Sequence, residues 1–153
     1  MRTKRVIPRT PREPEEITVY TDGACEPSNP GPGGWAWCVL EGRYESGGEP
    51  HSTNQRMELT AVLRALEYWT ALGVKLTVIS DSQYVVNCFL DRWHVKWLAT
   101  NWKNGRVKNR DLWEPLIELA LTHDVTFRWV RGHTGDRGNE LADTLASAAV
   151  PRF

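Results

Sequence analysis

Two short apolar segments, each leading to an aspartate and separated by a strong helix pattern, constrain the fold most. Residues 17–22 and 75–80 are typical of β-strands that end at Asp22 and just before Asp81. The apolar spacing between them predicts a helix over about 52–72. A strand, a helix and a second strand form a parallel pair with a right-handed crossover. Both aspartates are therefore expected at the carboxyl end of that pair, where such sheets place their functional sites.

The remaining patterns extend this alternation of strands and helices. An aromatic segment and a second strand are joined by the turn Glu41-Gly42-Arg43, which predicts a hairpin. This order predicts an α/β fold, with a five-stranded mixed sheet flanked by helices. The further elements are expected at 35–40, 44–49, 82–102, 111–122 (with Asp111 as its N-cap), 125–130 and 136–149.

The composition describes one globular domain. The chain has 153 residues, of which 41% are hydrophobic and 25% charged, enough for one buried core. Acidic and basic side chains are equal in number, 19 each, so a nucleic-acid surface would have to be local. Residues 1–16 are basic and proline-rich with little to bury. We expect them to be a mobile arm before a folded domain at 17–150, and a solvated tail is favoured over contact with nucleic acid.

The cysteine pattern and the lack of long apolar runs indicate where in the cell the protein is expected. Cys25, Cys38 and Cys88 have no metal-ligand spacing, and we expect reduced thiols, which favours a cytoplasmic location. No apolar run approaches the ~20 residues of a membrane helix, and no signal-peptide pattern precedes the first strand. The prediction is a monomer with no membrane contact and no obligate protein partner.

Acidic side chains in unfavourable places indicate the chemistry. Glu58 lies on the apolar stripe of its predicted helix, so it would point toward whatever that helix packs on. Carboxylates brought together repel one another and raise each other's pKa. Divalent cations neutralise such a cluster. Oxygen ligands with room for water and phosphate predict a magnesium site for phosphoryl chemistry.

The spacing of the last predicted helix places its acidic residue poorly. Asp143 follows His133, which lies in a loop between two glycines, by ten residues. The obvious core face of the helix consists of Leu141, Leu145 and Ala149. Periodicity alone would therefore leave Asp143 on the surface.

Five motifs together resemble the type-1 ribonuclease H family of bacteria. The resemblance covers about residues 17–149, with the motifs in the family's order and spacing. They are Thr21-Asp22-Gly23-Ala24-Cys25, Asn29 to Trp35, Thr53 to Leu59, Ser80-Asp81-Ser82-Gln83-Tyr84, and Gly132-His133-Thr134-Gly135 with Asn139 and Asp143.

The resemblance implies an endoribonuclease that hydrolyses the RNA strand of RNA/DNA hybrids. Asp22, Glu58, Asp81 and Asp143 would hold two Mg²⁺ ions, for which Mn²⁺ could substitute. One ion would activate water and the other would stabilise the leaving 3′-oxygen, giving 5′-phosphate and 3′-hydroxyl ends. His133 would help proton movement or product release; the alternative is an ordinary exposed loop histidine.

The resemblance also implies a set of substrate-binding residues. Asn29, Asn54 and Gln55 would read the minor groove of the hybrid, and Gln83 lies in the Asp81 motif on the same substrate surface. Thr53 and Asn109 would hold a phosphate of the DNA strand. Thr53 and Asn54 are also good helix caps, and both roles can hold at once.

A basic segment with interleaved tryptophans resembles the family's substrate handle. Residues 92–110 contain no acid and six bases: Arg92, Lys96, Lys103, Arg106, Lys108 and Arg110. Trp93, Trp97, Trp102, Lys96 and Lys103 are the expected contacts. The alternative is an amphipathic helix with its tryptophans packed inward. Leu98-Ala99-Thr100 replace residues that are commonly basic in bacterial relatives, so we expect a weaker handle.

Two rival functions share these features. A non-catalytic hybrid-binding module would have lost some of the mutually repelling acids, and the four are intact. A transposase or integrase would need a target-DNA or multimerisation domain, for which the chain has no room.

Overall fold

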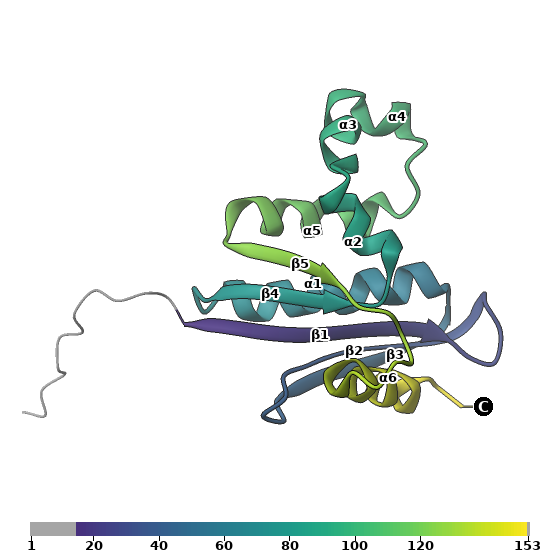
Figure 1. The fold of residues 1–153 in the computed structure, drawn as a ribbon. Helices are drawn as coiled ribbons and strands as arrows, with labels where there is room; N and C mark the ends of the chain where they lie inside the picture. The colour runs from purple at the N-terminus through teal and green to yellow at the C-terminus, as the bar shows by residue number, and fades with distance from the viewer. Residues whose placement is uncertain (1–14, 153) are drawn as a thin grey trace, which may run out of the picture.

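The central strand, β1 (Glu16–Cys25), pairs with a different kind of partner along each edge. In the computed structural model, which describes residues 15–152, it runs antiparallel to β2 (Gly31–Cys38) and parallel to β4 (Lys75–Ser80). β3 (Tyr44–Ser52) and β5 (Val125–Trp129) form the two edges, giving the order β3-β2-β1-β4-β5 (Figure 1). The predicted five-stranded mixed sheet is confirmed. The predicted arm falls almost entirely on residues 1–14, outside the described part.

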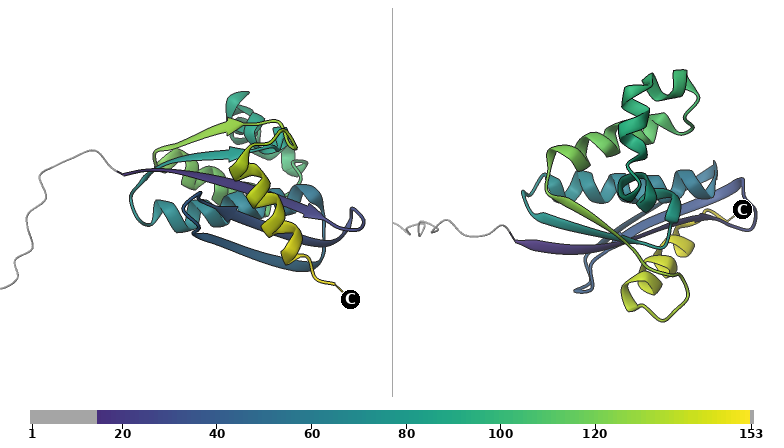
Figure 2. Two further views of the ribbon diagram at one scale, coloured as in Figure 1. Left: turned by 60° about the horizontal axis from the view of Figure 1, so that its bottom comes forward. Right: turned by 45° about the horizontal axis from the view of Figure 1, so that its top comes forward.

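Helices cover both faces of the sheet. α1 (Asn54–Thr70) and α5 (Arg110–Thr122) lie on one face, and α6 (Arg137–Ala149) lies on the other (Figures 1 and 2). Two adjacent glycines of β2 face these two layers. A Cβ at Gly33 would meet the side chain of Met57 in α1, and one at Gly34 would overlap the carbonyl of Ala146 in α6. Both helices therefore lie unusually close to the sheet.

The core lies mainly between the sheet and α1. The predicted apolar stripe of this helix is confirmed at Val62, Ala65, Leu66 and Trp69, each at most 2% exposed. Leu72, predicted to share the stripe, is 58% exposed because α1 ends at Thr70. The predicted N-cap is confirmed, since the Thr53 hydroxyl accepts from the Arg56 backbone N–H at 3.2 Å.

A protrusion stands away from the sheet. It consists of residues 93–109, with α3 (Trp93–Ala99) and α4 (Asn101–Gly105), and follows α2 (Gln83–Leu90) (Figure 1). The helical structure expected through residue 102 is interrupted at Arg92, whose φ is 59°. Within α4, Trp102, Lys103 and Asn104 also have positive φ, so this turn is left-handed. Such backbone is costly for residues other than glycine, which limits it to one turn.

Two further findings concern helix starts and membranes. α5 begins at Arg110 with Asn109 at its N-cap position, so the prediction of Asp111 as the cap is wrong by two residues. Asp111 is engaged instead by an arginine of α1.

Among the helices of residues 15–152, none is long and apolar enough to cross a membrane.

Candidate active site

The two strand aspartates lie where the parallel pairing of β1 and β4 stops. The last parallel pair is Thr21 with Ser80, and Asp22 and Asp81 are the next residues. β1 continues to Cys25 by antiparallel pairing with β2, so Asp22 lies inside a strand and does not end it, contrary to the prediction. Its expected place at the carboxyl end of the parallel pair is confirmed. The two aspartates interact electrostatically.

Glu58 reaches this edge because α1 crosses β1 at a glycine. A Cβ at Gly23 would overlap the Met57 carbonyl and come within 2.6 Å of the Glu58 nitrogen. Only glycine permits this approach. The Glu58 carboxylate accepts a hydrogen bond from Ser82 Oγ at 2.8 Å. Ser82 Oγ also accepts from the Val85 N–H at 3.2 Å and so caps α2, which ties the carboxylate to a second helix.

Asp143 also belongs to this edge, although its helix packs through a different face from the one predicted. The buried positions of α6 are Gly138, Asn139, Ala142 and Ala146, and the predicted core positions Leu141, Leu145 and Ala149 are only half-buried. Small side chains are buried here because the helix lies directly on the sheet, where Gly138 contacts the Tyr20 ring. Asp143 flanks this face, within hydrogen-bonding reach of Asp22.

The four carboxylates, hereafter the carboxylate cluster, destabilise one another's charges. Burial, the charge of Asp81 and the contact with Asp143 together raise the pKa of Asp22 to about 8. Burial raises the pKa of Glu58 to about 7, against the lowering effect of the Ser82 hydrogen bond. Burial also raises the pKa of Asp81, and the Asn139 hydrogen bond opposes the shift. Without a cation, the charged forms of these carboxylates are therefore unfavourable at neutral pH.

The oxygen ligands of the cluster suit a hard cation whose remaining ligands are water and substrate oxygens. Among residues 15–152, no group of three or more His, Cys, Asp or Glu side chains forms a site that could hold a metal ion by itself. The charges of Asp22, Asp81 and Asp143 act on one another, and Glu58 interacts with Asp81. Mg²⁺ typically binds to one or two carboxylates, keeps several waters and uses substrate phosphates. The open arrangement therefore fits magnesium better than a closed protein cage.

The histidine loop lies against the cluster. A Cβ at Gly132 would stand 2.8 Å from Asp81 Oδ2, so this glycine allows the loop to approach the carboxylate. His133 follows with a φ of 58°, is exposed, and lies close enough that its charge lowers the pKa of Asp81. Its side chain is therefore both near the cluster and open to solvent. Its role in the reaction stays a prediction.

The predicted minor-groove residues include one connected pair. The Asn54 backbone N–H donates to Asn29 Oδ1 at 3.0 Å, and the Cys25 N–H donates to Asn54 Oδ1 at 2.7 Å. In both side chains the oxygen is the engaged atom, which ties the loop after β1 to the start of α1. Gln55 is exposed at the second position of α1, and Gln83 is exposed at the first position of α2. All four lie near the carboxylate cluster in the chain, and their substrate contacts stay predictions.

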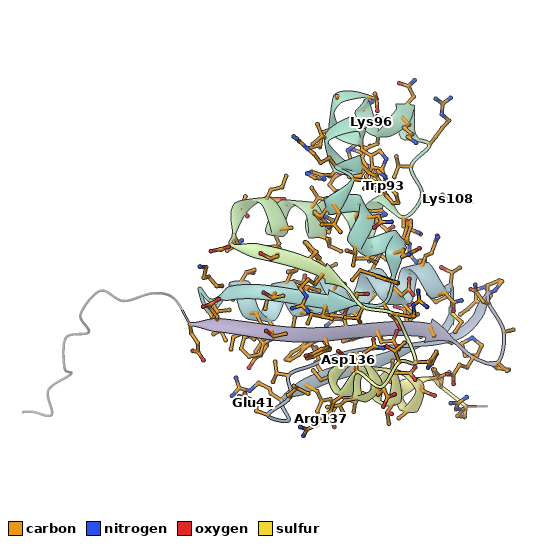
Figure 3. All side chains as sticks on the ribbon, viewed as in Figure 1. Glu41, Trp93, Lys96, Lys108, Asp136 and Arg137 are labelled. Atoms are coloured by element: carbon orange, nitrogen blue, oxygen red, sulfur yellow. The ribbon has the colours of Figure 1, made fainter. Side chains whose placement is uncertain are left out.

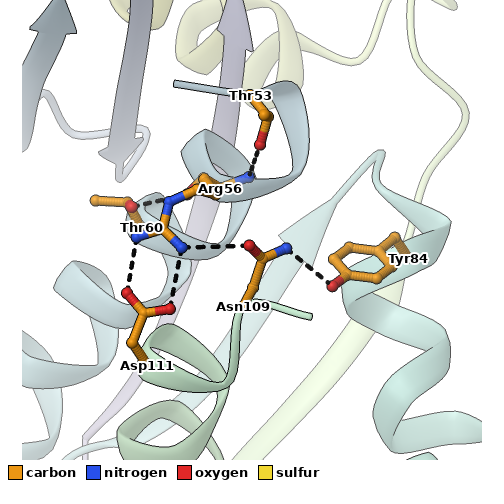
Figure 4. A network of polar contacts seen from close by, with 6 residues as sticks. All are labelled: Thr53, Arg56, Thr60, Tyr84, Asn109 and Asp111. Carbon is orange, nitrogen blue, oxygen red and sulfur yellow. Dashed lines mark hydrogen bonds and ion pairs between the residues drawn. The ribbon is translucent and has the colours of Figure 1, made fainter. Parts of the chain in front are cut away.

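A polar network joins the two residues predicted to hold a phosphate. Arg56 Nη1 donates to Asn109 Oδ1 at 3.2 Å, and Asn109 Nδ2 donates to the Tyr84 hydroxyl at 3.4 Å (Figure 4). Thr53 joins through its bond to the Arg56 N–H. Sequence reasoning missed Arg56 as a site residue. Its place inside the Thr53–Leu59 motif was the available signal.

The tryptophans of the protrusion are mainly structural. Trp97 and Trp102 are 7% and 4% exposed and stack with centroids 5.7 Å apart, and Trp97 also meets Trp113 edge-on at 5.2 Å. The inward packing left as the alternative is confirmed for these two rings, and their contact with nucleic acid stays a prediction. Trp93 is half-buried. Figure 3 shows Trp93 and Lys96 on the protrusion, with Lys108 on the loop that returns from it.

An open hollow borders the exposed part of this protrusion. It has a volume of about 400 Å³ and is lined by Tyr84, Trp93, Lys96, Trp97 and Lys103. A second hollow of about 320 Å³ runs from Tyr84 and Gln55 to Arg106 and Lys108. Cations on an apolar aromatic floor are suited to a phosphate backbone and bases.

Comparison with known proteins decides the family. The RNase H family model matches residues 14–151, nearly the whole chain. The chain belongs to the ribonuclease H family. Ribonuclease H of Nitratidesulfovibrio vulgaris strain DP4 is 48% identical over 145 residues, 90% of each chain. Ribonuclease H of Cupriavidus necator is 46% identical over 142 residues, 89% of this chain and 96% of the relative.

A solved structure supports the same assignment at the level of the ribonuclease H fold. LC9-RNase H1, described as a type 1 RNase H with the type 2 active-site motif, superposes with a TM-score of 0.78 at 30% identity. The match covers 93% of this chain and 74% of the solved one. The predicted resemblance is confirmed. Family membership supports endoribonuclease activity on RNA/DNA hybrids.

Proposed function

We propose that this ribonuclease H hydrolyses the RNA strand of RNA/DNA hybrids with two magnesium ions, leaving 5′-phosphate and 3′-hydroxyl ends. The observation that carries the proposal is the carboxylate cluster at the end of the parallel pair, where burial and mutual charge raise the pKa of Asp22 and Glu58. A binding module would gain nothing from such destabilised charges. A metal-dependent nuclease uses such carboxylates to hold its ions.

The metals would be held by Asp22, Glu58, Asp81 and Asp143. Bound there, divalent cations would supply an activated water and charge stabilisation on the leaving oxygen. Asp22 interacts with both Asp81 and Asp143, so it is the side chain placed to serve both ions. Asn139 and Ser82 hydrogen-bond Asp81 and Glu58 and would orient these ligands.

The substrate would be held at two places by the chain's own residues. Asn54 and Gln55 lie at the start of α1, just before Glu58 in sequence, and Asn29 of the loop after β1 is hydrogen-bonded to Asn54; these three would contact the minor groove. Thr53, Arg56 and Asn109 form the polar network of Figure 4 and would hold a DNA-strand phosphate. We call these three residues the phosphate pocket. His133 would move a proton or help the cleaved strand to leave.

A substrate panel tests the proposal. End-labelled RNA/DNA hybrid, duplex RNA, duplex DNA and a duplex with one embedded ribonucleotide are incubated with Mg²⁺, with Mn²⁺ and with EDTA. The expected result is metal-dependent cleavage of the hybrid alone or best, with phosphatase-sensitive 5′ ends on the products. Asp22→Asn removes a proposed metal ligand and should lose this cleavage, and Asp124→Asn, which changes an exposed acid before β5, is its matched control. Cleavage in EDTA, or equal cleavage of duplex DNA, would contradict the proposal.

A further inference from the structure

The guanidinium of Arg56 is held at one end by an acid of α5. Nη1 donates to Asp111 Oδ1 at 3.0 Å and Nη2 donates to Asp111 Oδ2 at 2.7 Å, which is a two-point fork (Figure 4). Nη1 also donates to Asn109 Oδ1 at 3.2 Å. Such a fork fixes both the position and the plane of the guanidinium.

The other edge of the same guanidinium is left for a ligand. The group carries five N–H donors, and the three bonds above use Nη1 and Nη2. Within residues 15–152, no acceptor is recorded for Nε, so the Nε–Nη2 edge retains two donors side by side. The Arg56 side chain is 35% exposed. These two donors are therefore the ones that remain for a phosphate while Asp111 stays bound.

The carboxylate on the opposite side is a permanent charge. Asp111 lies in the first turn of α5, where the helix dipole favours an anion. The hydrogen bond from Arg56 lowers the pKa of Asp111, and the side chain is 63% exposed. Asp111 is therefore charged at neutral pH. It offsets part of the attraction between Arg56 and a phosphate.

We propose that Asp111 is a positioning residue of the phosphate pocket that orients Arg56 and at the same time limits its affinity for the DNA-strand phosphate. This inference rests on the proposed function, because it concerns the pocket that the hybrid would use. Because Asp111 neutralises part of its charge, Arg56 fixes the orientation of the phosphate more than it attracts the phosphate. The pocket then holds a duplex firmly only when the minor-groove contacts are made as well, which favours the correct substrate over any phosphate backbone.

A variant that removes the charge of Asp111 but keeps an acceptor for Arg56 tests whether that charge limits phosphate affinity. Asp111→Asn keeps an oxygen for Arg56 Nη1 and removes the negative charge. Binding of a short labelled RNA/DNA hybrid is measured in EDTA by fluorescence anisotropy over a range of salt. We expect Kd to fall about two- to fivefold, the size of one exposed charge interaction, with a steeper dependence on salt. Under Mg²⁺ the same change is expected in KM.

The chain offers a matched control on the same helix. Glu114 pairs with Arg110 at 2.7 Å, is 54% exposed and makes no contact with Arg56. Glu114→Gln should leave Kd and its salt dependence at parental values. Asp111→Ala removes the acceptor as well as the charge. It should tighten binding less than Asp111→Asn, because Arg56 loses its fixed orientation.

The outcomes separate this inference from the proposed function. If Asp111→Asn behaves like Glu114→Gln, or binds hybrid more weakly than the parent, the inference is overturned. If Arg56→Ala binds hybrid normally while the parent cleaves it, the pocket is wrong and the inference falls, but the proposed nuclease stands. A parent that binds hybrid in EDTA yet never cleaves it would contradict the proposed function, and the effect of Asp111→Asn on binding would still decide the inference.

Discussion

The carboxylate cluster and the protrusion hold their charged groups in opposite ways. Asp22 is 8% exposed and has a raised pKa, so the fold is under stress where like charges meet. In the protrusion, the lysines are exposed, and the rings of Trp97 and Trp102 are buried together with His94. Stability and chemistry therefore separate in this chain. The carboxylate cluster lowers the stability of the fold and provides reactive groups. The protrusion is stabilised by apolar packing and presents its cations to solvent.

The largest expected effect is on the chemistry of the cluster. Asp81→Asn keeps the side-chain shape and removes one charged ligand, so cleavage should fall at least about a hundredfold. The same change relieves repulsion with Asp22, so the metal-free melting temperature should rise. Cleavage assays and thermal melts in EDTA check both directions. Cleavage retained above a few per cent of the parental rate would break the assignment.

In the protrusion, the expected effect of a substitution is a loss of stability. Trp97→Ala removes a buried ring that packs on Trp102 and Trp113, which should cost about 3–5 kcal/mol of unfolding free energy. Leu98→Ala is the matched control, because Leu98 is 54% exposed in the same helix. Urea unfolding measures both variants. A loss below about 1 kcal/mol for Trp97→Ala would mean that the ring is not a structural element.

A smaller catalytic effect is expected from the loop that borders the cluster. If His133 moves a proton, His133→Ala should lower kcat about 10- to 100-fold, at the lower end of acid–base contributions, with KM nearly unchanged. His123→Ala, an exposed histidine at the end of α5, is the control. A loss as complete as that of Asp81→Asn would show that His133 is a ligand or a structural residue.

The elements and most of the cluster were predictable from local patterns. Asp22 and Asp81 follow from a strand–helix–strand crossover, and Glu58 follows from an acid on an apolar stripe. Asp143 could not be placed by spacing, because large leucines suggested a face that the helix does not bury. α6 packs through small residues such as Gly138 and Ala142, a choice imposed by its close approach to the sheet.

The protrusion and the phosphate pocket show a second limit of sequence reasoning. A tryptophan between bases is compatible with stacking on nucleic acid and with burial, and only the contacts with Trp113, distant in sequence, decide for Trp97. Arg56 is similar. An arginine at the start of a helix is usually a solvated cation, and its partner Asp111 lies 55 residues away. Pairings of this kind come from the tertiary fold.

The smallest effect is expected on the outer surface of the protrusion. Neutralising Lys96, Lys103, Arg106 and Lys108 removes counterion release, so affinity for hybrid should drop and the salt dependence should flatten by roughly 0.7–0.9 per lost phosphate contact. Restoring bases at residues 98–100 should tighten binding. Hybrid-binding titrations over a range of salt measure both. An unchanged slope would mean that the protrusion is only a solvated helix pair.

The raised pKa values give the cluster a stability that depends on pH. A carboxyl whose pKa is higher in the folded than in the unfolded chain stabilises the fold below its unfolded value and loses that contribution as pH rises through its folded value. For Asp22 and Glu58 the window runs from the ordinary values of 3.8 and 4.5 to about 8 and about 7. The metal-free protein should therefore be less stable at pH 9 than at pH 5. Asp22→Asn should reduce this difference.

Direct metal binding tests the central claim, that the carboxylate cluster is a metal site. Calorimetric titration of the free protein with Mn²⁺ at pH 7, in two buffers of different ionisation enthalpy, reports both binding and proton release. Because metal ligands must be deprotonated and Asp22 and Glu58 have pKa values of about 8 and about 7, binding should release on the order of one proton. Asp81→Asn should weaken this binding, and Asp124→Asn should not. Binding without proton release, or no binding while hybrid is still cleaved, would contradict the account.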